Sequence, residues 1–183
     1  MHSYNIGPVQ IEHGGTNLGL IFGGATLKYD EQTEQTRADI TGDNPRGIYV
    51  TGESVEISGA ITEATLAQIA KIAGGVHSSG TTSQTDLAAR VGTNLVTNAA
   101  ECVLKPIVGS TVSTTASEWT YIPACVIIPK MEVVGQYNGQ KAWAFLAMGV
   151  PVTAAMIASG GHLYNTGTPK YAVNDLVRFG LLS

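Results

Sequence analysis

The chain has 183 residues, which is enough for one domain with a sizeable core and no need for disulfide or metal staples. Hydrophobic residues make up 44% of it and charged residues only 13%, against roughly 25% charged in a typical soluble protein. We therefore expect oligomer contacts to cover part of the surface. The net charge of −4 argues against a nucleic-acid grip, which needs clustered Lys and Arg.

Compartment signals are weak in this sequence. The first eight residues lack a basic region followed by an apolar core, so no signal peptide is expected. Cys102 and Cys125 lie in apolar, strand-like stretches and are predicted to be buried, reduced thiols, with an unsupported disulfide as the alternative. Residues 142–161 carry no charge, but Gly149 and Pro151 interrupt them, so we predict a strand, a bend and a short apolar segment rather than a membrane span.

The N-terminal third predicts strands separated by glycine turns. Residues 9–13 and 18–22 alternate between apolar and polar side chains, and each stretch is followed by a pair of glycines that turns the chain. Residues 25–39 then form a long predicted strand whose second half is almost wholly polar. A polar strand must face water or a partner, or lie at the edge of a sheet.

A hairpin and a helix follow. Residues 40–47 have the Gly and Asn-Pro markers of a loop, and residues 49–61 return as a strand, which predicts an extended hairpin. Thr62 is the predicted N-cap of the next helix, with Glu63 in its first turn and Gly74-Gly75 at its end. The apolar stripe expected to pack on the sheet comprises Leu66, Ile69, Ile72 and Ala73.

The remainder alternates between polar and strand-like segments. Residues 76–100 are rich in Ser, Thr, Gly and Asn, which predicts an exposed polar excursion with a helical turn around residues 86–90. The further predicted strands are residues 101–108, 119–128, 131–137, 141–148 and 176–179, with a two-residue turn at Asn138-Gly139. The whole chain, residues 1–183, is therefore predicted to be a single mainly β domain: a sandwich or barrel of antiparallel strands with one flanking α-helix.

Residue patterns for catalysis and metal binding are missing from the sequence. The four histidines are scattered without zinc-type spacing, and the sequence has neither a Gly-x-Ser-x-Gly elbow nor a phosphate loop. Asp39 and Asp43 frame a faint resemblance to a calcium loop, but the alternating oxygen ligands and the terminal Glu are missing. We expect no enzyme activity and no cofactor.

Half of the fourteen acidic residues fall in the predicted hairpin, between Tyr29 and Glu56. Only Arg37 and Arg46 oppose these seven acids, so the hairpin carries a charge of about −5. A solvated face is the simpler interpretation. The alternative is a surface that repels polyanions, so that DNA passes without binding.

The order of elements from Gly23 to Gly75 resembles the major tail tube protein family of tailed bacteriophages. The matching features are a Gly-Gly turn, a Glu- and Thr-rich strand, a polar loop, a Thr-Gly-Glu turn into a Val-x-Ile strand, and a capped amphipathic helix. In this sequence they are residues 23–29, 34–39, 50–57 and 62–66, within just under a third of the chain.

This resemblance implies a tail-tube-like fold that assembles into homo-hexameric rings, which stack into a hollow tube. Its partners would be further copies of itself, a tape measure protein and passing DNA in the lumen, and a sheath, tail terminator and baseplate, without membrane insertion. The expected location is the virion tail, after assembly in the host cytoplasm. The lumen-lining candidates are Asp30, Glu34 and Glu56, and the inter-ring or inter-subunit loop candidates are Asp39, Asp43, Asn44 and Arg46.

Two other function classes stay open at this point. A β-sandwich binding or adhesive module would need aromatic residues clustered on one face, whereas Trp119, Trp143 and the seven tyrosines are spread along the chain. An enzyme with an unrecognised site is the other alternative.

Overall fold

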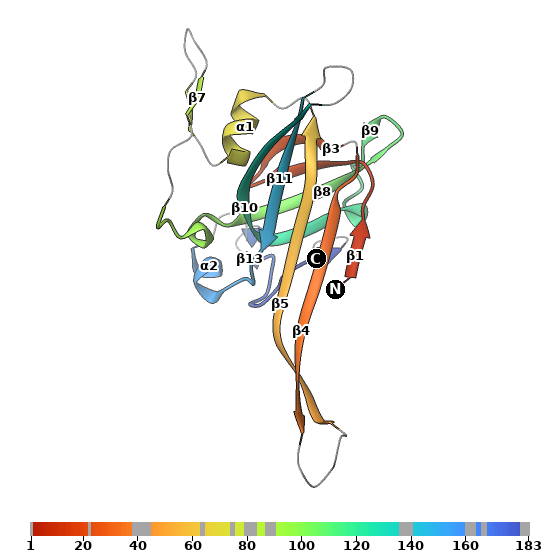
Figure 1. Ribbon diagram of the computed structural model, residues 1–183, viewed down its shortest axis with the longest axis vertical. Coiled ribbons are helices and arrows are strands. Elements are labelled where there is room, and N and C mark those ends of the chain that lie inside the picture. Colours follow the sequence, from red (N-terminus) through yellow and green to blue (C-terminus); the bar gives the residue numbers. More distant parts are fainter. Residues whose placement is uncertain are drawn as a thin grey trace.

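The computed structural model describes residues 2–21, 23–37, 45–62, 65–73, 76–78, 84–86, 91–135, 141–159, 164–165 and 168–179. The chain is mainly β, as predicted, and within these residues the main feature is a ten-stranded antiparallel sheet (Figure 1). Its strands are β1 (His2–Asn5), β2 (Val9–His13), β3 (Thr16–Ile21), β4 (Thr26–Arg37), β5 (Pro45–Thr62), β8 (Ala100–Val108), β9 (Thr111–Val112), β10 (Thr120–Gly135), β11 (Lys141–Gly149) and β14 (Arg178–Phe179).

Shorter elements surround this sheet. Two small pairs of strands stand apart from it, and the helices are short. These elements are β6 (Val76–Ser78) with β7 (Gln84–Asp86), β12 (Tyr164–Asn165) with β13 (Thr168–Pro169), the α-helices α1 (Leu66–Ala73) and α2 (Ala154–Ala158), and the 3-10 turns η2 (Leu95–Asn98) and η3 (Ala116–Glu118). In the described part of the chain, no helix is long and apolar enough to cross a membrane.

The sheet closes on itself to form a barrel. Its strand order is β1-β4-β5-β11-β10-β8-β2-β3, and β3 returns to β5 through the pair Leu20 and Thr62. Gly19 makes this approach possible: its φ is +127°, and a Cβ there would lie 2.5 Å from Cγ2 of Ile61. Any other residue at this position would clash and be strained, so glycine permits the closure.

Alternating residues of the closed strands fill the barrel. Side chains that point inward from β2, β5, β8, β10 and β11 are apolar and almost completely buried, as the period of two requires. The largest of them include Ile11, Ile57, Ile61, Leu104, Ile122 and Phe145. The predicted thiols belong to this core: Cys102 and Cys125 are both free and buried.

Helix α1 begins later than predicted. Thr62 is the last residue of β5, so it is not the N-cap, and the helix has no acidic residue in its first turn. The cap is instead a reciprocal capping box: Thr65 Oγ1 accepts from Gln68 N at 3.3 Å, and Gln68 Oε1 accepts from Thr65 N at 2.7 Å. Gln68 Nε2 also donates to the carbonyl of Asn17 at 3.1 Å, which fastens the helix to β3.

The structure corrects several other sequence predictions. Residues 119–128 and 131–137 were expected to form two strands, but β10 runs through both regions with a register shift between Ile128 and Glu132. Asp86 was placed in a helical turn and instead ends strand β7. Strand β1 was not predicted, because its sequence His-Ser-Tyr-Asn has no apolar alternation. The turn at Asn138-Gly139 lies outside the described residues.

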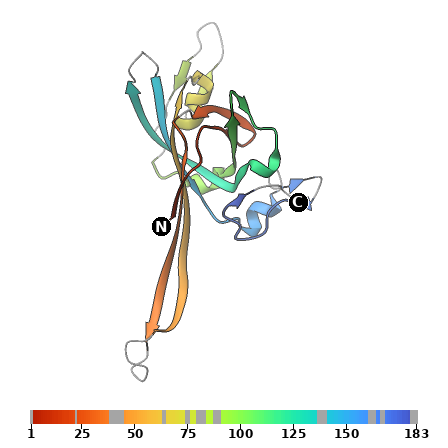
Figure 2. The ribbon, with the colours of Figure 1, turned by 90° about the vertical axis from the view of Figure 1, so that its right-hand side faces the viewer.

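The β4–β5 hairpin extends far beyond the barrel. Figures 1 and 2 show it as a narrow, twisted ribbon that leaves the body in one direction. The hairpin projects because β4 and β5 pair with each other over a longer stretch than with their other neighbours. β11 pairs with β5 only from Val55 to Thr62, and β1 pairs with β4 only from Thr26 to Tyr29. The hairpin pairing continues without these neighbours as far as Arg37 and Pro45.

Candidate functional site

The projecting part of the hairpin is the least self-contained region of the described chain. We call residues 31–37 of β4 and 45–54 of β5 the arm. Each of its two strands pairs with the other and has no strand partner on its outer edge among the described residues. Exposed edges of this kind present rows of backbone N–H and C=O groups that can pair with another chain.

The hairpin register places the three predicted lumen residues on one face. Glu56 lies directly opposite Lys28, and Asp30 is two residues further along β4. Glu34 follows Asp30 by four positions, so strand alternation returns it to the same face. This acidic face (Asp30, Glu34, Glu56) points away from the barrel core, because Leu27, Val55 and Ile57 occupy the core-facing positions.

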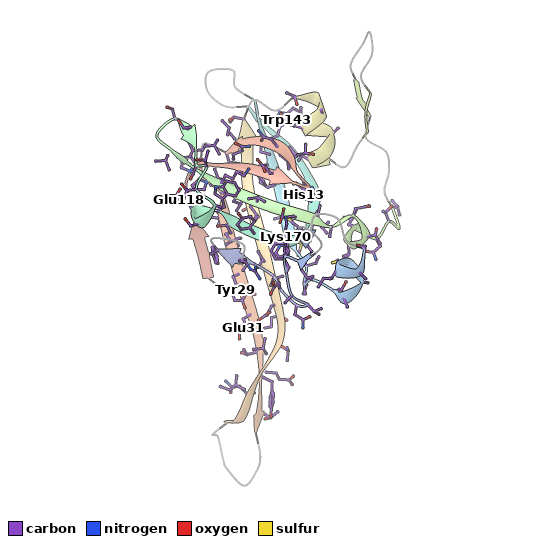
Figure 3. All side chains as sticks on the ribbon, turned by 180° about the vertical axis from the view of Figure 1, so that it is seen from behind. His13, Tyr29, Glu31, Glu118, Trp143 and Lys170 are labelled. Carbon is purple, nitrogen blue, oxygen red and sulfur yellow. The ribbon has the colours of Figure 1, made fainter. Side chains whose placement is uncertain are left out.

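The opposite face of the hairpin base carries a second acidic pair. Glu31 and Glu53 are directly opposite each other across the two strands, an arrangement in which like charges destabilise a sheet. Tyr29, which precedes them, donates its hydroxyl proton to Glu53 Oε1 at 3.0 Å. This hydrogen bond, with smaller contributions from partial burial and from the charges of Glu53 and Glu31, raises the pKa of Tyr29 above its usual value. Figure 3 shows Tyr29 where the hairpin leaves the body and Glu31 further along the hairpin.

Apolar side chains are exposed on the arm. Ile48 and Tyr49 are each 61% exposed and Val50 is 53% exposed; we call these three residues the arm cluster. A β-bulge opposite Gln32 and Thr33 places an extra residue on β5, so Val50 pairs with Thr33 and Ile48 with Gln35. Ile48 and Val50 therefore share the face that carries Glu31. Tyr49 lies on the other face, where a Cβ on Gly47 would come within 2.9 Å of its ring.

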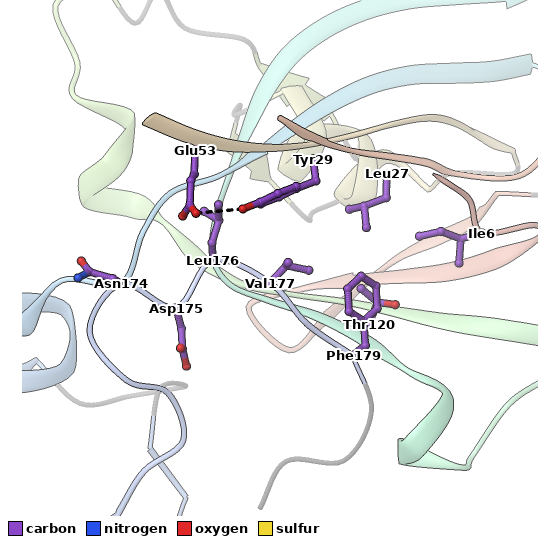
Figure 4. Close-up of a pocket in the computed structure, with 10 residues that line it drawn as sticks. All are labelled: Ile6, Leu27, Tyr29, Glu53, Thr120, Asn174, Asp175, Leu176, Val177 and Phe179. Atoms are coloured by element: carbon purple, nitrogen blue, oxygen red, sulfur yellow. Dashed lines mark hydrogen bonds between the residues drawn. The ribbon is translucent and has the colours of Figure 1, made fainter. Parts of the chain in front are cut away.

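A cavity of about 710 Å³ opens at the base of the arm (Figure 4). It lies between the core-facing side of the hairpin and the chain segment that leads into β14. Most of its wall is apolar, and the Tyr29–Glu53 hydrogen bond crosses one side of it. The residues that line it include Ile6, Leu27, Tyr29, Leu176, Val177 and Phe179.

A second stretch of strand edge is unpaired at the other side of the sheet. β8 pairs with β10 from Thr120 to Cys125, whereas β11 pairs with β10 from Cys125 to Gly135. Residues 126–135 of β10 therefore have no strand on their outer edge in the described part of the chain, although α1 lies against this strand. The long strands thus run beyond the closed part of the sheet and leave unpaired edges in two places, along the arm and along residues 126–135 of β10.

The buried histidine and the buried thiols of the body lie close to one another in its core. His13 Nε2 lies 3.0 Å from the carbonyl oxygen of Cys125. A hydrogen bond with Cys125, together with burial, raises the pKa of the Cys102 thiol well above its usual range. A thiol held protonated in an apolar core is a poor nucleophile and a poor metal ligand. Within the described residues, no group of three or more His, Cys, Asp and Glu side chains is placed to hold a metal.

Of the four predicted loop residues, Arg46 alone lies in the described part of the chain. Asp39, Asp43 and Asn44 lie outside the described residues, and Arg46 lies within β5, where its side chain is not described. Two features of the site were missed from the sequence: the exposed arm cluster and the cavity. The run Ile48-Tyr49-Val50 was a usable signal, because three consecutive apolar residues cannot all face one core from a strand.

No protein-family model matches the chain, and no curated protein matches it.

Proposed function

We propose that this chain is the structural subunit of a phage tail tube, which assembles into rings, on the hexameric plan of that family, and stacks them into a hollow conduit for DNA. The observation that carries the proposal is the arm, a long ribbon with two unpaired edges and exposed apolar side chains. An isolated two-stranded hairpin is at best marginally stable in water. Such a ribbon is expected where neighbouring copies supply the missing partners.

The unpaired edges provide a route to ring closure. One side of the sheet ends at the arm, and the other ends at residues 126–135 of β10. When the first edge of one subunit pairs with the second edge of the next, the contact joins two different surfaces and repeats around a ring. Repetition of this contact continues the sheets of all copies into one wall.

The exposed surface of the single chain supports an assembled state. It amounts to 10776 Å² for a chain of 19.1 kDa, whereas the scaling for compact monomers gives roughly 8400 Å². The chain is therefore less compact than a typical monomer of its mass, by roughly 2400 Å² of surface, as expected of a subunit whose segments project toward its neighbours.

The acidic face supports a lumen for DNA. Asp30, Glu34 and Glu56 repeat in every copy. Among the described residues, Lys28 is the one cation that pairs across the strands with any of the three, and its partner is Glu56. A ring of such faces lines a channel with negative charge, and phosphate groups are repelled from it rather than bound. DNA can then pass through without adhering to the wall.

Electron microscopy of the purified full chain tests the assembly. We expect rings with a hollow centre, or stacks of them, once the protein concentration exceeds the assembly threshold. A chain that stays monomeric at every concentration that can be reached contradicts the proposal. Glycan binding by that monomer would instead support the adhesive module.

The lumen assignment has a separate test. Replacement of Asp30, Glu34 and Glu56 by Lys should preserve the tube but slow or block DNA ejection from particles, because each added cation contributes a phosphate contact. Glu31→Lys serves as a control, since Glu31 is on the opposite face of the same strand. Normal ejection by the triple variant would remove the acidic face from the lumen.

A further inference from the structure

The cavity at the base of the arm has a polar end and an apolar end (Figure 4). Leu27, Val177 and Phe179 line the apolar end, and Glu53 lies at the other end. The volume of about 710 Å³ falls within the range of roughly 300–1,000 Å³ that small-molecule sites occupy. A concave, mostly apolar surface with a few polar groups is the usual form of such a site.

Two carboxylates line the cavity, and their partners differ. Asp175 Oδ2 accepts from the backbone N–H of Ala172 and pairs with Arg178 Nη2, each at 2.9 Å. Glu53 Oε1 instead accepts from the Tyr29 hydroxyl at 3.0 Å, and Oε2 of the same carboxylate can accept from a further donor. The charge of Asp175 is therefore balanced by an arginine, whereas this partner of Glu53 is neutral.

Glu31 adds a second negative charge beside Glu53. The two residues are directly opposite each other across β4 and β5, on the side of the ribbon where Leu27 and Tyr29 line the cavity. Like charges in this arrangement destabilise a sheet. A cation bound at Glu53 replaces part of this repulsion by attraction, so the polar end of the cavity favours a cationic ligand.

The apolar end of the cavity contains a buried hydroxyl. Thr120 lines the cavity beside Phe179, its pairing partner across β10 and β14. Thr120 is only 5% exposed, and its side chain forms no hydrogen bond with any of the described residues. Buried polar groups are normally hydrogen-bonded. A ligand with a hydrogen-bonding group at this end can supply a partner for the hydroxyl.

We propose that the cavity binds a small amphipathic cation, an arylalkylammonium that carries a hydroxyl at its far end. Its ammonium group contacts Glu53, its ring packs against Val177, and its hydroxyl contacts Thr120. A neutral apolar ligand leaves Glu53 without a counter-charge, and an anion is repelled by Glu53 and Glu31. The site goes beyond the proposed function and does not depend on ring formation, because one chain supplies its whole wall.

Isothermal titration calorimetry of the full chain, below the concentration at which it assembles, tests the site with four matched probes. Tyramine carries both the ammonium and the hydroxyl, phenethylamine lacks the hydroxyl, para-ethylphenol lacks the charge, and para-hydroxyphenylpropanoate replaces the ammonium by a carboxylate. We expect a Kd of roughly 0.1 mM for tyramine, a reasonable value for a ligand of this size. Phenethylamine and para-ethylphenol should each bind roughly tenfold more weakly, and the propanoate should not bind measurably.

Two substitutions in the cavity wall separate the two polar contacts. Glu53→Gln should reduce the affinity for tyramine to that for para-ethylphenol, while the affinity for para-ethylphenol stays unchanged. Thr120→Val should remove the preference for tyramine over phenethylamine, while the affinity for phenethylamine stays unchanged and shows that the cavity is intact. Glu34→Gln is the matched control, because Glu34 belongs to the same hairpin but does not line the cavity.

The opposite results overturn the proposal. Equal affinities for tyramine and para-ethylphenol, or tighter binding of the propanoate, would contradict a cationic ligand. Equal affinities for tyramine and phenethylamine would contradict the contact with Thr120. If none of the four probes binds, the site as a whole is wrong. Electron microscopy for rings is a separate measurement, so failure of this site leaves the tube subunit standing, and failure of the tube leaves the site standing.

Discussion

One strand of this protein belongs to two very different regions. From Val55 to Thr62, β5 has β11 on one side, and its inward side chains are buried in the barrel. From Pro45 to Ser54 the same strand pairs only with β4, and its apolar residues are exposed. Ile57 is fully buried whereas Ile48 is 61% exposed. The body is thus stabilised by its own core, whereas the arm has no strand partner beyond its own hairpin among the described residues.

The electrostatics of the two regions differ in the same way. In the body, Lys105 Nζ pairs with Glu12 Oε1 at 2.6 Å and lies 4.3 Å from the centre of the Trp119 ring. At the base of the arm, Glu31 and Glu53 face each other across the strands. The body thus pairs opposite charges within the chain, whereas the base of the arm places two like charges across from each other.

The largest expected effect comes from truncation of the same residue type in the two regions of β5. Ile57→Ala should lower the free energy of unfolding by about 2–5 kcal/mol, because it removes buried methyl groups and leaves a cavity. Ile48→Ala should change it by no more than about 0.5 kcal/mol. Urea unfolding of the dilute, unassembled chain measures both values. Similar losses in the two variants would mean that the arm is packed in the monomer and would remove the distinction.

The next largest loss of stability is expected at Gly19, where β3 closes the barrel against β5. Gly19→Ala should cost about 1–3 kcal/mol, since the new Cβ overlaps Ile61 and the backbone has a positive φ. Gly15 is the matched control: its φ is +74°, but nothing lies within 4 Å of an added Cβ. Gly15→Ala therefore tests backbone strain alone and should cost less. If both variants lose the same stability, β3 does not press against β5 as described.

The smallest expected effect concerns a buried hydroxyl of the body. Tyr171 donates its hydroxyl proton to Glu101 Oε1 at 2.6 Å, and burial together with this bond raises the pKa of Tyr171. Because the folded state favours the protonated hydroxyl, the hydroxyl contributes its full stabilisation at any pH below the ordinary tyrosine pKa of about 10. This contribution is lost as the pH rises from that value through the raised pKa of the folded state. Tyr171→Phe should lower the free energy of unfolding by about 1 kcal/mol at neutral pH. The difference in this free energy between the variant and the wild type should become smaller at alkaline pH.

Unfolding curves between neutral pH and pH 11 test this dependence. Tyr49→Phe, at an exposed position in the arm, should differ from the wild type by no more than about 0.5 kcal/mol at neutral pH. A difference between wild type and Tyr171→Phe that grows as the pH rises would contradict the assignment.

Much of the fold was predictable from periodicity. The strands with regular alternation, such as β2 and the core-facing half of β5, were predicted close to their observed limits, because burial on one face sets their pattern. The helix start was wrong because Thr62 and Thr65 are both plausible caps, and the sheet extends β5 through the first of them. Strand β1 lacks a pattern of its own and pairs with β4 through backbone contacts.

The candidate site was predictable only in part. The placement of Asp30, Glu34 and Glu56 on one face follows from the hairpin register, which a two-residue period already implies. The cavity joins Ile6, Leu27 and Phe179, which are far apart in the sequence, so only the three-dimensional packing could reveal it. The exposure of Ile48 depends on where β11 ends, which no local pattern encodes.

Amide hydrogen exchange of the arm tests the central claim, that its strand edges are free in the single chain and covered in the assembly. We predict fast exchange for residues 31–37 and 45–54 in the dilute chain, slow exchange for β5 from Val55 onward, and strong protection of the arm once rings or tubes form. Arm amides that are already slow in the monomer, or that stay fast in the assembled particle, would contradict the account.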